Sequence, residues 1–190
     1  MPECDEPSLS LTEWLVLCLV CEKPAHGFAL GSLLGAGGEL GRVWQVPRPL
    51  IYRALHRLEA LALIGPAGLE RSAAGPVRQV SRATAAGRAA APAWLARPAA
   101  HGRDIRTELL VKLALLDRAG ADPGELLDAQ HAQLAPIAAA LENRLDSAEG
   151  FERTLTLWRR ETMSATLRFL SAVAPGPGLA DVADRAGRGG

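Results

Sequence analysis

The chain has 190 residues, of which 48% are hydrophobic and 4% aromatic, and its formal net charge is zero. This length and composition suit a folded protein of one domain or two small ones, and they exclude a disordered polymer. The longest apolar run, Trp14 to Cys21, is far too short for a membrane span, and the acidic residues before it argue against a secretory signal. We therefore expect a cytoplasmic protein that does not bind membranes.

The charge is unevenly distributed along the chain. Residues 1–39 carry one Lys/Arg and six Asp/Glu, residues 40–106 carry eleven and three, and residues 107–190 carry nine and twelve. The middle segment therefore has a net charge of +8 between two acidic segments. Such asymmetry favours a polyanionic partner, because Lys and Arg that meet phosphates release condensed counterions. A solvated, arginine-rich surface is the alternative interpretation.

Two short helices are predicted at the start of the chain. Ser10 and Glu13 form a capping-box pattern, which opens a helix that runs to about Glu22 and is apolar on nearly all sides. The stretch "AHGFALGSLLG" predicts a second helix over about 27–34. His26, just before it, is expected to cap or support the turn into this helix rather than to bind a ligand.

The stretch "VPRPLIYRALHRLEALALI", residues 46–64, predicts a third helix with two different faces. Pro47 and Pro49 suit its first turn, where the amides have no partner within the helix to lose. Helical spacing places an apolar stripe on the inward face, formed by Ile51, Leu55, Leu58 and Ala62. The outward face carries Arg53, His56 and Arg57, with Tyr52 at the boundary.

Turn residues and short extended pieces follow, and they predict a basic β-hairpin. In "VRQVSRAT", residues 77–84, Arg78 and Arg82 share the parity of Val80 and therefore one face of a strand. Three short helices followed by a hairpin form a winged helix-turn-helix, here over 9–96, whose third helix enters a DNA major groove. The predicted fold class is mainly α, with α+β character from the wing.

The second half of the chain, residues 103–174, is predicted to be helical. One helix over 104–120 presents Ile105, Leu109, Leu113 and Leu116 on one face. Another helix is predicted to start with Asp122 as its N-cap, Pro123 at the first helical position and Glu125 at the third. It carries Leu127, Leu134, Leu141 and Leu145, and Pro136 is expected to cause a kink or an interruption. The Gly/Pro/Ala-rich tail, 175–190, is expected to be disordered.

The last predicted helix, 151–173, has apolar residues at alternating spacings of four and three, which is a heptad seam. The seam is Phe151, Leu155, Trp158, Thr162, Ala165, Phe169 and Ala172. Two heptad-like helices in so small a fragment cannot bury their stripes against a large core of their own. A second copy of the chain is the economical partner, and an intramolecular antiparallel helix pair is the alternative.

Catalytic and metal-binding patterns are absent from the sequence. Cys18 and Cys21 have CxxC spacing but lie within an apolar helix, and only Cys4 remains, so neither a four-thiolate zinc site nor a disulfide framework is expected. The four histidines show no ligand spacing, and no nucleophile elbow or phosphate loop occurs. We expect no enzyme activity, no metal and no cofactor.

The candidate DNA contacts differ in kind. Arg53, with His56 and Arg57 beside it, is the candidate for reading base edges, because Arg binds guanine bidentately; ordinary surface arginines are the alternative. Arg48 at the helix start suits a phosphate, and Arg78 and Arg82 suit the DNA backbone or minor groove. Tyr52 is compatible with core packing or with DNA contact. Trp14 and Trp158 are candidate walls of an effector pocket at a dimer seam, with core packing as the alternative.

Three blocks of the sequence together resemble the PadR family of transcriptional regulators. They are "LSLTEWLVLCLVCEKPAHGFAL", "WQVPRPLIYRALHRLEALALIGP" and "GPVRQVSRATAAGRAAAPAWL", with the His26-Gly27-Phe28 triplet and Thr84-x-x-Gly87-Arg88 among the matching features. Downstream, "RDIRTELLVKLALL" and "LWRRETMSATLRFL" resemble the helical C-terminal part of longer members, so the resemblance covers about 9–173. It implies a homodimeric, DNA-binding repressor that responds to a small hydrophobic or aromatic effector.

The sequence departs from the family at two positions, which keep a second function open. Pro47 stands where the family usually has a serine N-cap, and Ser81 stands where many members have an aromatic residue in the wing. The alternative function is a helical protein-interaction or ligand-sequestering module with a degenerate winged domain. Replacing the arginines of the third helix would leave the function of such a module unchanged.

Overall fold

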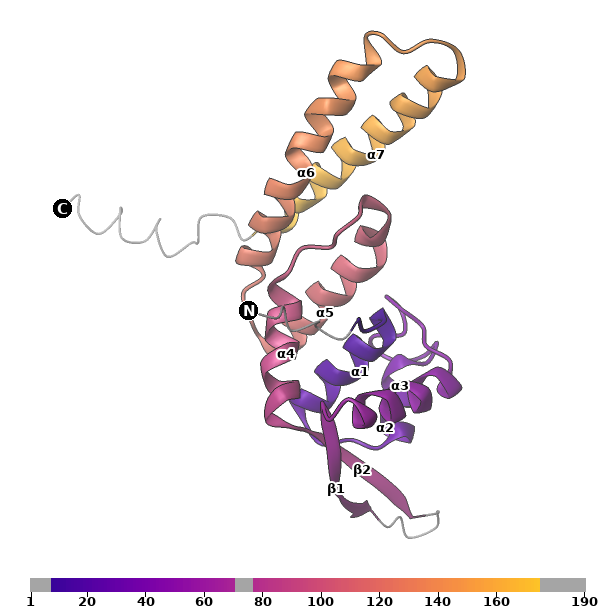
Figure 1. The fold of residues 1–190 in the computed structure, drawn as a ribbon, viewed down its shortest axis with the longest axis vertical. Helices are drawn as coiled ribbons and strands as arrows, with labels where there is room; N and C mark the ends of the chain where they lie inside the picture. Colours follow the sequence, from indigo (N-terminus) through magenta and orange to yellow (C-terminus); the bar gives the residue numbers. More distant parts are fainter. Residues whose placement is uncertain (1–7, 71–76, 175–190) are drawn as a thin grey trace, which may run out of the picture. The chain divides into compact units, whose positions relative to one another are not determined.

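The computed structural model describes residues 8–70 and 77–174, so the predicted disordered tail, 175–190, lies outside the described residues. The chain forms two compact units that divide between Ala121 and Asp122, and each is described by itself (Figure 1). None of the helices in the described ranges has the length and apolar character needed to cross a membrane.

The first unit begins with three helices, as predicted: α1 (Leu11–Glu22), α2 (Gly27–Leu34) and α3 (Arg48–Ala60). The capping box of α1 is present, since the Glu13 amide donates to Ser10 Oγ (3.4 Å) and the Ser10 amide donates to Glu13 Oε2 (2.7 Å). All residues from Trp14 to Val20 are buried, because α1 is surrounded by the core of this unit. His26 caps α2, with its Nδ1 accepting from the Ala29 amide at 3.0 Å.

The buried stripe of α3 differs from the predicted one. Ile51, Ala54 and Leu58 are buried, whereas Leu55 is half-buried. Ala62 is exposed and lies beyond the end of the helix at Ala60, with a left-handed φ of 54°. The inward assignment of Ala62 was therefore wrong, because the helical spacing holds only as far as the helix continues.

A two-stranded antiparallel wing follows, formed by β1 (Ile64–Glu70) and β2 (Arg78–Ala83). The pairing runs from Ile64–Ala83 to Glu70–Arg78, with an irregularity in β1 between Pro66 and Gly68. Backbone hydrogen bonds in both directions join Ser81 to Ala25, just before α2, at 2.9 and 3.0 Å. The residue at the second departure from the family pattern thus ties the wing to the helical part of the unit.

The Thr84 motif begins the next helix, α4 (Ala85–Ala96), and joins it to the turn after α3. Thr84 Oγ1 donates to the Ala62 carbonyl at 2.7 Å and accepts from the Gly87 amide at 3.1 Å. A side chain at Gly87 would collide with the Leu63 carbonyl. Arg88 donates to the Ala83 carbonyl at 2.6 Å. This motif therefore has a structural role in closing the wing.

The helix predicted over 104–120 is divided into three parts: a 3₁₀ turn η1 (Gly102–Asp104), a π-helical segment η2 (Ile105–Leu109) and α5 (Leu110–Ala119). Ile105 and Leu109 are buried as predicted, but Leu113 and Leu116 are only half-buried. The wider π turn rotates the following residues about the axis. The buried face of α5 is consequently formed by Val111, Lys112 and Leu115.

The second unit contains α6 (Gly124–Leu145) and α7 (Gly150–Val173), which pack as an antiparallel pair (Figure 1). Asp122 Oδ1 accepts from the Gly124 amide at 2.9 Å. The N-cap is Pro123, however, and it makes no side-chain cap hydrogen bond, so the helix begins one residue later than predicted, with Gly124 instead of Pro123 at its first position. The helix continues through Pro136, and the predicted interruption does not occur. In α6, Leu127 and Leu134 are buried, and Leu141 and Leu145 are half-buried.

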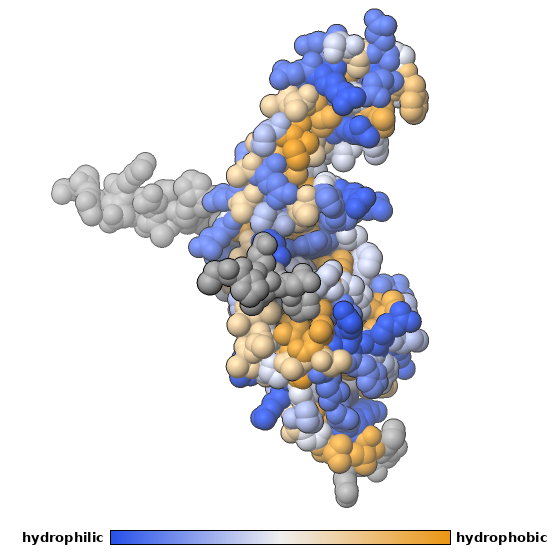
Figure 2. Space-filling view, viewed as in Figure 1, coloured by the Kyte–Doolittle hydropathy of each residue, from blue (hydrophilic) through white to orange (hydrophobic). Residues whose placement is uncertain are grey.

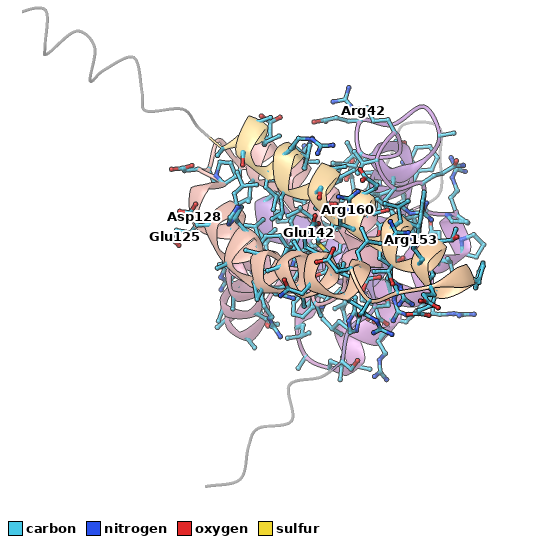
Figure 3. All side chains as sticks on the ribbon, turned by 90° about the horizontal axis from the view of Figure 1, so that it is seen from above. Arg42, Glu125, Asp128, Glu142, Arg153 and Arg160 are labelled. Carbon is cyan, nitrogen blue, oxygen red and sulfur yellow. The ribbon has the colours of Figure 1, made fainter. Side chains whose placement is uncertain are left out.

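Ion pairs link the two helices. Arg160 Nη1 lies 3.3 Å from Glu142 Oε1, and the two labelled side chains lie close together in the view from above (Figure 3). Arg144 pairs with Glu152 at 2.7 Å. The intramolecular helix pair that the sequence left as an alternative is thus present.

The predicted heptad seam of α7 lies largely outside this pair. Buried α7 side chains are Thr156 and Leu170, whereas Phe151 and Trp158 are 79% and 69% exposed. Leu155 is half-buried, and the remaining seam residues are exposed, namely Thr162, Ala165, Phe169 and Ala172. One face of α7 therefore packs within the unit and another carries uncovered aromatic side chains.

Candidate nucleic-acid interface

The outward face of α3 carries the basic side chains that the sequence predicted there. Arg53, His56 and Arg57 are exposed, and Tyr52 is 47% exposed. Burial of Ile51, Ala54 and Leu58 orients the helix, since these residues fix which face meets the core. Arg57 Nε approaches Glu13 Oε1 at 3.9 Å. Among the described residues, Arg53 has no carboxylate within 4.0 Å, so its charge is available to a ligand.

Arg48 and Arg78 are brought together by a side chain that sequence reasoning did not include among the DNA contacts. The guanidinium carbon of Arg48, at the start of α3, lies 5.1 Å from the ring centroid of Phe28. The guanidinium carbon of Arg78, in β2, lies 4.2 Å from the same centroid. Phe28 is 41% exposed on α2. Helix α3 and the wing therefore meet at one aromatic ring.

Two glycines of α2 allow α3 to approach this closely. A Cβ atom at position 27 would lie 2.5 Å from Cε1 of Tyr52, and one at position 31 would lie 3.4 Å from Cγ and Nε of Arg48. The Tyr52 ring and the Arg48 side chain thus lie against the backbone of α2. The spacing of four residues between Gly27 and Gly31 places both on one helix face, and this sequence signal could have indicated the contact.

The wing carries Glu70, which lies close to His26, and two arginines, Arg78 and Arg82. Arg78 stands opposite Glu70 in the strand register, yet the Glu70 carboxylate lies 3.5 Å from His26 Nε2. Within 8–70 and 77–174, no carboxylate lies within 4.0 Å of the Arg48, Arg78 or Arg82 guanidinium. Arg82 is exposed on β2, on the strand face that it shares with Arg78.

Figure 2 shows apolar surface at the far end of the wing, where Leu69 and Val77 are 71% and 52% exposed. The rest of the candidate interface, by contrast, is polar and cationic. It consists of Arg48, Tyr52, Arg53, His56 and Arg57 on α3, and Arg78 and Arg82 on β2.

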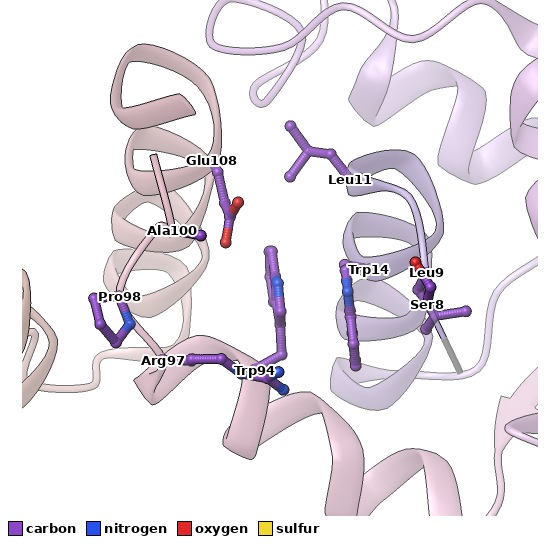
Figure 4. A pocket seen from close by; sticks show the side chains of 9 residues that line it. All are labelled: Ser8, Leu9, Leu11, Trp14, Trp94, Arg97, Pro98, Ala100 and Glu108. Carbon is purple, nitrogen blue, oxygen red and sulfur yellow. The ribbon is translucent and has the colours of Figure 1, made fainter. Parts of the chain in front are cut away.

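A cavity of about 380 Å³ lies within the first unit beside Trp14. Trp14 stacks on Trp94, with ring centroids 5.3 Å apart and ring planes 5° from parallel. Figure 4 shows these indoles side by side, with Glu108 pointing toward Trp94. The lining also includes Leu9, Leu11, Arg97, Pro98 and Ala100. Trp158, the second predicted wall, is not one of the lining residues and is exposed on α7.

A fully buried lysine, Lys112, contacts three of the residues that line this cavity. Lys112 Nζ donates to the Arg97 carbonyl (2.6 Å), pairs with Glu108 Oε1 (2.7 Å) and lies 4.6 Å from the Trp94 ring centroid. Burial lowers the pKa of Lys112, and the hydrogen bond with Glu108 opposes that shift. Position 112 follows the π turn, and for this reason the spacing of the apolar residues did not predict that it is buried.

Cys18 and Cys21, the cysteines of the described residues, show no feature of a reactive or metal-binding site. Burial raises the pKa of the Cys18 thiol and, to a smaller extent, of Cys21. Both thiols are free, and Cys21 Sγ contacts the Gly87 carbonyl at 3.7 Å. A raised pKa keeps a thiol protonated and therefore weakly nucleophilic. In the part of the chain that the structure describes, no cluster of three potential metal ligands occurs.

The first unit defines a winged helix-turn-helix fold, with a basic third helix and a basic wing. No protein-family model matches the sequence, and no curated protein matches it. Among solved structures, the chain is similar to Bacillus subtilis PadR in complex with operator DNA, with 18% identity, a TM-score of 0.43, and coverage of 85% of this chain and 96% of that one.

Two further solved structures have similar values. Bacillus subtilis PadR in complex with p-coumaric acid matches with 16% identity and a TM-score of 0.41, covering 86% of this chain and 96% of that chain. The smu.1604c protein from Streptococcus mutans UA159 matches with 12% identity and a TM-score of 0.41, covering 84% and 96%.

Proposed function

We propose that this protein is a sequence-specific DNA-binding transcriptional regulator that represses by occupying its operator as a homodimer. The observation that carries the proposal is the cationic face of α3 and β2, where Arg48, Arg53, Arg78 and Arg82 project without carboxylate partners among the described residues. Uncompensated arginines on a recognition helix and a wing suit a duplex, since phosphates replace the missing counter-charges. An exposed helix of this kind fits the width of the major groove.

The side chains divide into two roles. Arg53, His56 and Arg57 occupy the middle of the outward face of α3 and would read base edges in the groove. Arg48, Arg78 and Arg82 lie at the helix start and on the wing, and would bind the backbone. Tyr52 packs on Gly27 and is 47% exposed, so it is accessible to a ligand of this face.

The homodimer is supported by the uncovered face of α7. Phe151 and Trp158 are among the most exposed large apolar side chains of the described residues, and they belong to a seam with heptad spacing. Large exposed apolar patches mark interaction sites. A seam of this spacing is complementary to a second copy of itself, which would pair two winged domains on a two-fold symmetric operator.

The cavity beside Trp14 supports a small aromatic effector as the ligand that relieves repression. Its volume of about 380 Å³ lies in the range typical of ligand sites, and the stacked Trp14 and Trp94 offer an aromatic wall. Calorimetric titration with p-coumaric acid as the first probe should show binding that Trp94→Leu abolishes. Trp44→Phe, which changes a tryptophan outside the lining, should leave that binding intact.

Selection of bound duplexes from a random DNA pool tests the DNA-binding function. The native protein should enrich a palindromic motif, and the Arg53→Ala, Arg57→Ala double variant should lose the enrichment, with a fall in affinity for the selected site of about 100-fold, at about 1–3 kcal/mol for each base-reading arginine.

The matched control removes two exposed arginines outside the interface, Arg106→Ala with Arg168→Ala, and should keep the motif. An equal loss of enrichment in both double variants would mean that only the net charge of the protein matters. That result would contradict base reading by α3. Absence of any enriched motif with and without the aromatic probe would refute the regulator and favour the interaction module.

A further inference from the structure

We propose that Phe28 is a positioning residue that holds Arg48 of α3 and Arg78 of the wing as one phosphate-binding pair. This inference rests on the proposed DNA-binding function and adds to it a residue that need not touch DNA. The ring lies on α2, which is neither the recognition helix nor the wing, and both guanidinium groups lie over it at 5.1 and 4.2 Å from its centroid.

The Phe28 ring offsets the repulsion between the two guanidinium groups that lie over it. Two guanidinium carbons within these distances of one centroid are closer together than about 10 Å, the Debye length at 0.1 M salt, so the two charges repel each other in the free protein. Neither charge has a carboxylate within 4.0 Å among the described residues. The negative face of an aromatic ring attracts both cations without neutralising them.

An aromatic partner leaves the arginines able to bind phosphate, whereas a carboxylate would compete for the same donors. A guanidinium stacks through its flat face and keeps its N–H donors at the edge for bidentate binding to phosphate oxygens. Glu70 is the carboxylate opposite Arg78 in the strand register. The Glu70 carboxylate instead lies 3.5 Å from His26 Nε2, and the Arg78 guanidinium lies over the Phe28 ring.

The backbone around Phe28 fixes the ring relative to both arginines. Gly31, three residues further along α2, lets the Arg48 side chain lie 3.4 Å from its Cβ position. On the other side, Ala25 is hydrogen-bonded to Ser81 in the same strand as Arg78. The segment 25–31 is therefore attached to α3 and to β2, and Phe28 lies between the two attachments.

A double-mutant cycle on binding to a random-sequence 30-base-pair duplex measures this role, because phosphate contacts do not depend on sequence. Phe28→Leu removes the ring but keeps an apolar side chain, and should weaken binding by about 5- to 30-fold, as expected for two exposed cation–π contacts. In the Arg48→Ala, Arg78→Ala background the same change should have no effect. Phe28→Tyr, which keeps the ring, should restore native affinity.

Arg57 provides the matched control, since it lies on α3 but contacts Glu13 instead of the ring. Phe28→Leu should add to Arg57→Ala without coupling. In NMR spectra of the free protein, the Nε–Hε resonances of Arg48 and Arg78 should shift when Phe28 becomes Leu, while that of Arg57 should not. This second measurement needs no DNA.

The outcomes separate this proposal from the general one. Native-like DNA binding by Phe28→Leu, or an equal loss in the Arg48→Ala, Arg78→Ala background, would overturn the positioning role and leave DNA binding intact. No binding of any duplex by the native chain would overturn both proposals. Unchanged arginine resonances in Phe28→Leu would overturn the ring contact itself.

Discussion

The two units of this protein bury their apolar side chains to different degrees. In the first unit, seven consecutive residues of α1, Trp14 to Val20, are buried in one cluster with side chains of α2, α3 and α4. In the second, α6 and α7 make a two-helix pair in which Phe151, Trp158 and Phe169 are exposed. Two helices offer each other only one face. The first unit therefore has a core of its own, whereas the second leaves large apolar side chains of α7 exposed.

The largest effect is expected from a charge placed on the exposed seam of α7, because this charge would prevent a second copy from covering the seam. We expect Trp158→Glu to convert the proposed dimer to monomer, raising its dissociation constant by at least about 100-fold, because dimerisation would desolvate an unpaired carboxylate and lose an aromatic anchor. Sedimentation equilibrium measures the change. DNA affinity should fall in parallel, because one winged domain then binds one half-site.

Leu157→Glu is the matched control for that variant. Leu157 is also exposed, at 40%, and the same substitution there introduces the same charge one residue away, about 100° around the helix. The dimer should tolerate it. Equal dissociation by both variants would mean that the seam is not the dimer interface. A native protein that sediments as a monomer would refute the dimer.

A second prediction concerns the closed core of the first unit. Lys112→Met should lower the free energy of unfolding of this unit by about 1–3 kcal/mol, because it leaves the Arg97 carbonyl without this donor and removes the partner of Glu108. The cost stays moderate because Glu108 is partly exposed to water. Urea unfolding followed by Trp fluorescence measures it, and a variant as stable as the native chain would contradict the structural role of the buried cation.

The same lysine gives stability a specific pH dependence. Because burial lowers its pKa in the folded state, the unfolded chain binds this proton more tightly. Between the folded pKa and the usual lysine value of about 10.4, the free energy of unfolding therefore rises with pH. Native stability minus Lys112→Met stability should increase through this range, and a decrease would show that the folded pKa is raised instead.

The smallest effect is expected at the turn between α3 and β1. Ala62 has φ of 54°, a conformation that a glycine adopts without the steric cost of a Cβ atom. Ala62→Gly should change stability by less than about 1 kcal/mol, in the stabilising direction, since strain relief in the folded state exceeds the added chain entropy. Thermal unfolding should show a rise in Tm, and a clear fall would indicate that the position is not strained.

Local signals predicted much of the first unit, because they depend on neighbours in the chain. Ser10 with Glu13 located the start of α1, His26 was placed at the cap of α2, and the prolines marked the start of α3. The wing followed from the alternation in β2. The roles of the DNA-contact residues remain predictions.

Features that depend on distant contacts were not predicted. Phe28 acquires its place between Arg48 and Arg78 only when three elements meet, and a single exposed aromatic residue on α2 has no pattern that reveals this. The burial of Lys112 was not predicted, because the π turn at Ile105–Leu109 rotates the buried face of α5 away from the positions that a spacing of 3.6 residues gives. Trp94, the partner of Trp14, was missed for the same reason of distance.

The hydrogen bonds between Ala25 and Ser81 also bear on aggregation. A two-stranded wing that projects from a protein has two open strand edges, and open edges can pair with other chains. On β2, the Ala25–Ser81 bridge occupies the edge near its base. On β1, Pro66 lacks an amide donor and the irregular pairing at Gly68 bends the strand. The wing therefore carries exposed Leu69 and Val77 on two strands whose edges are interrupted, at Ser81 on β2 and between Pro66 and Gly68 on β1.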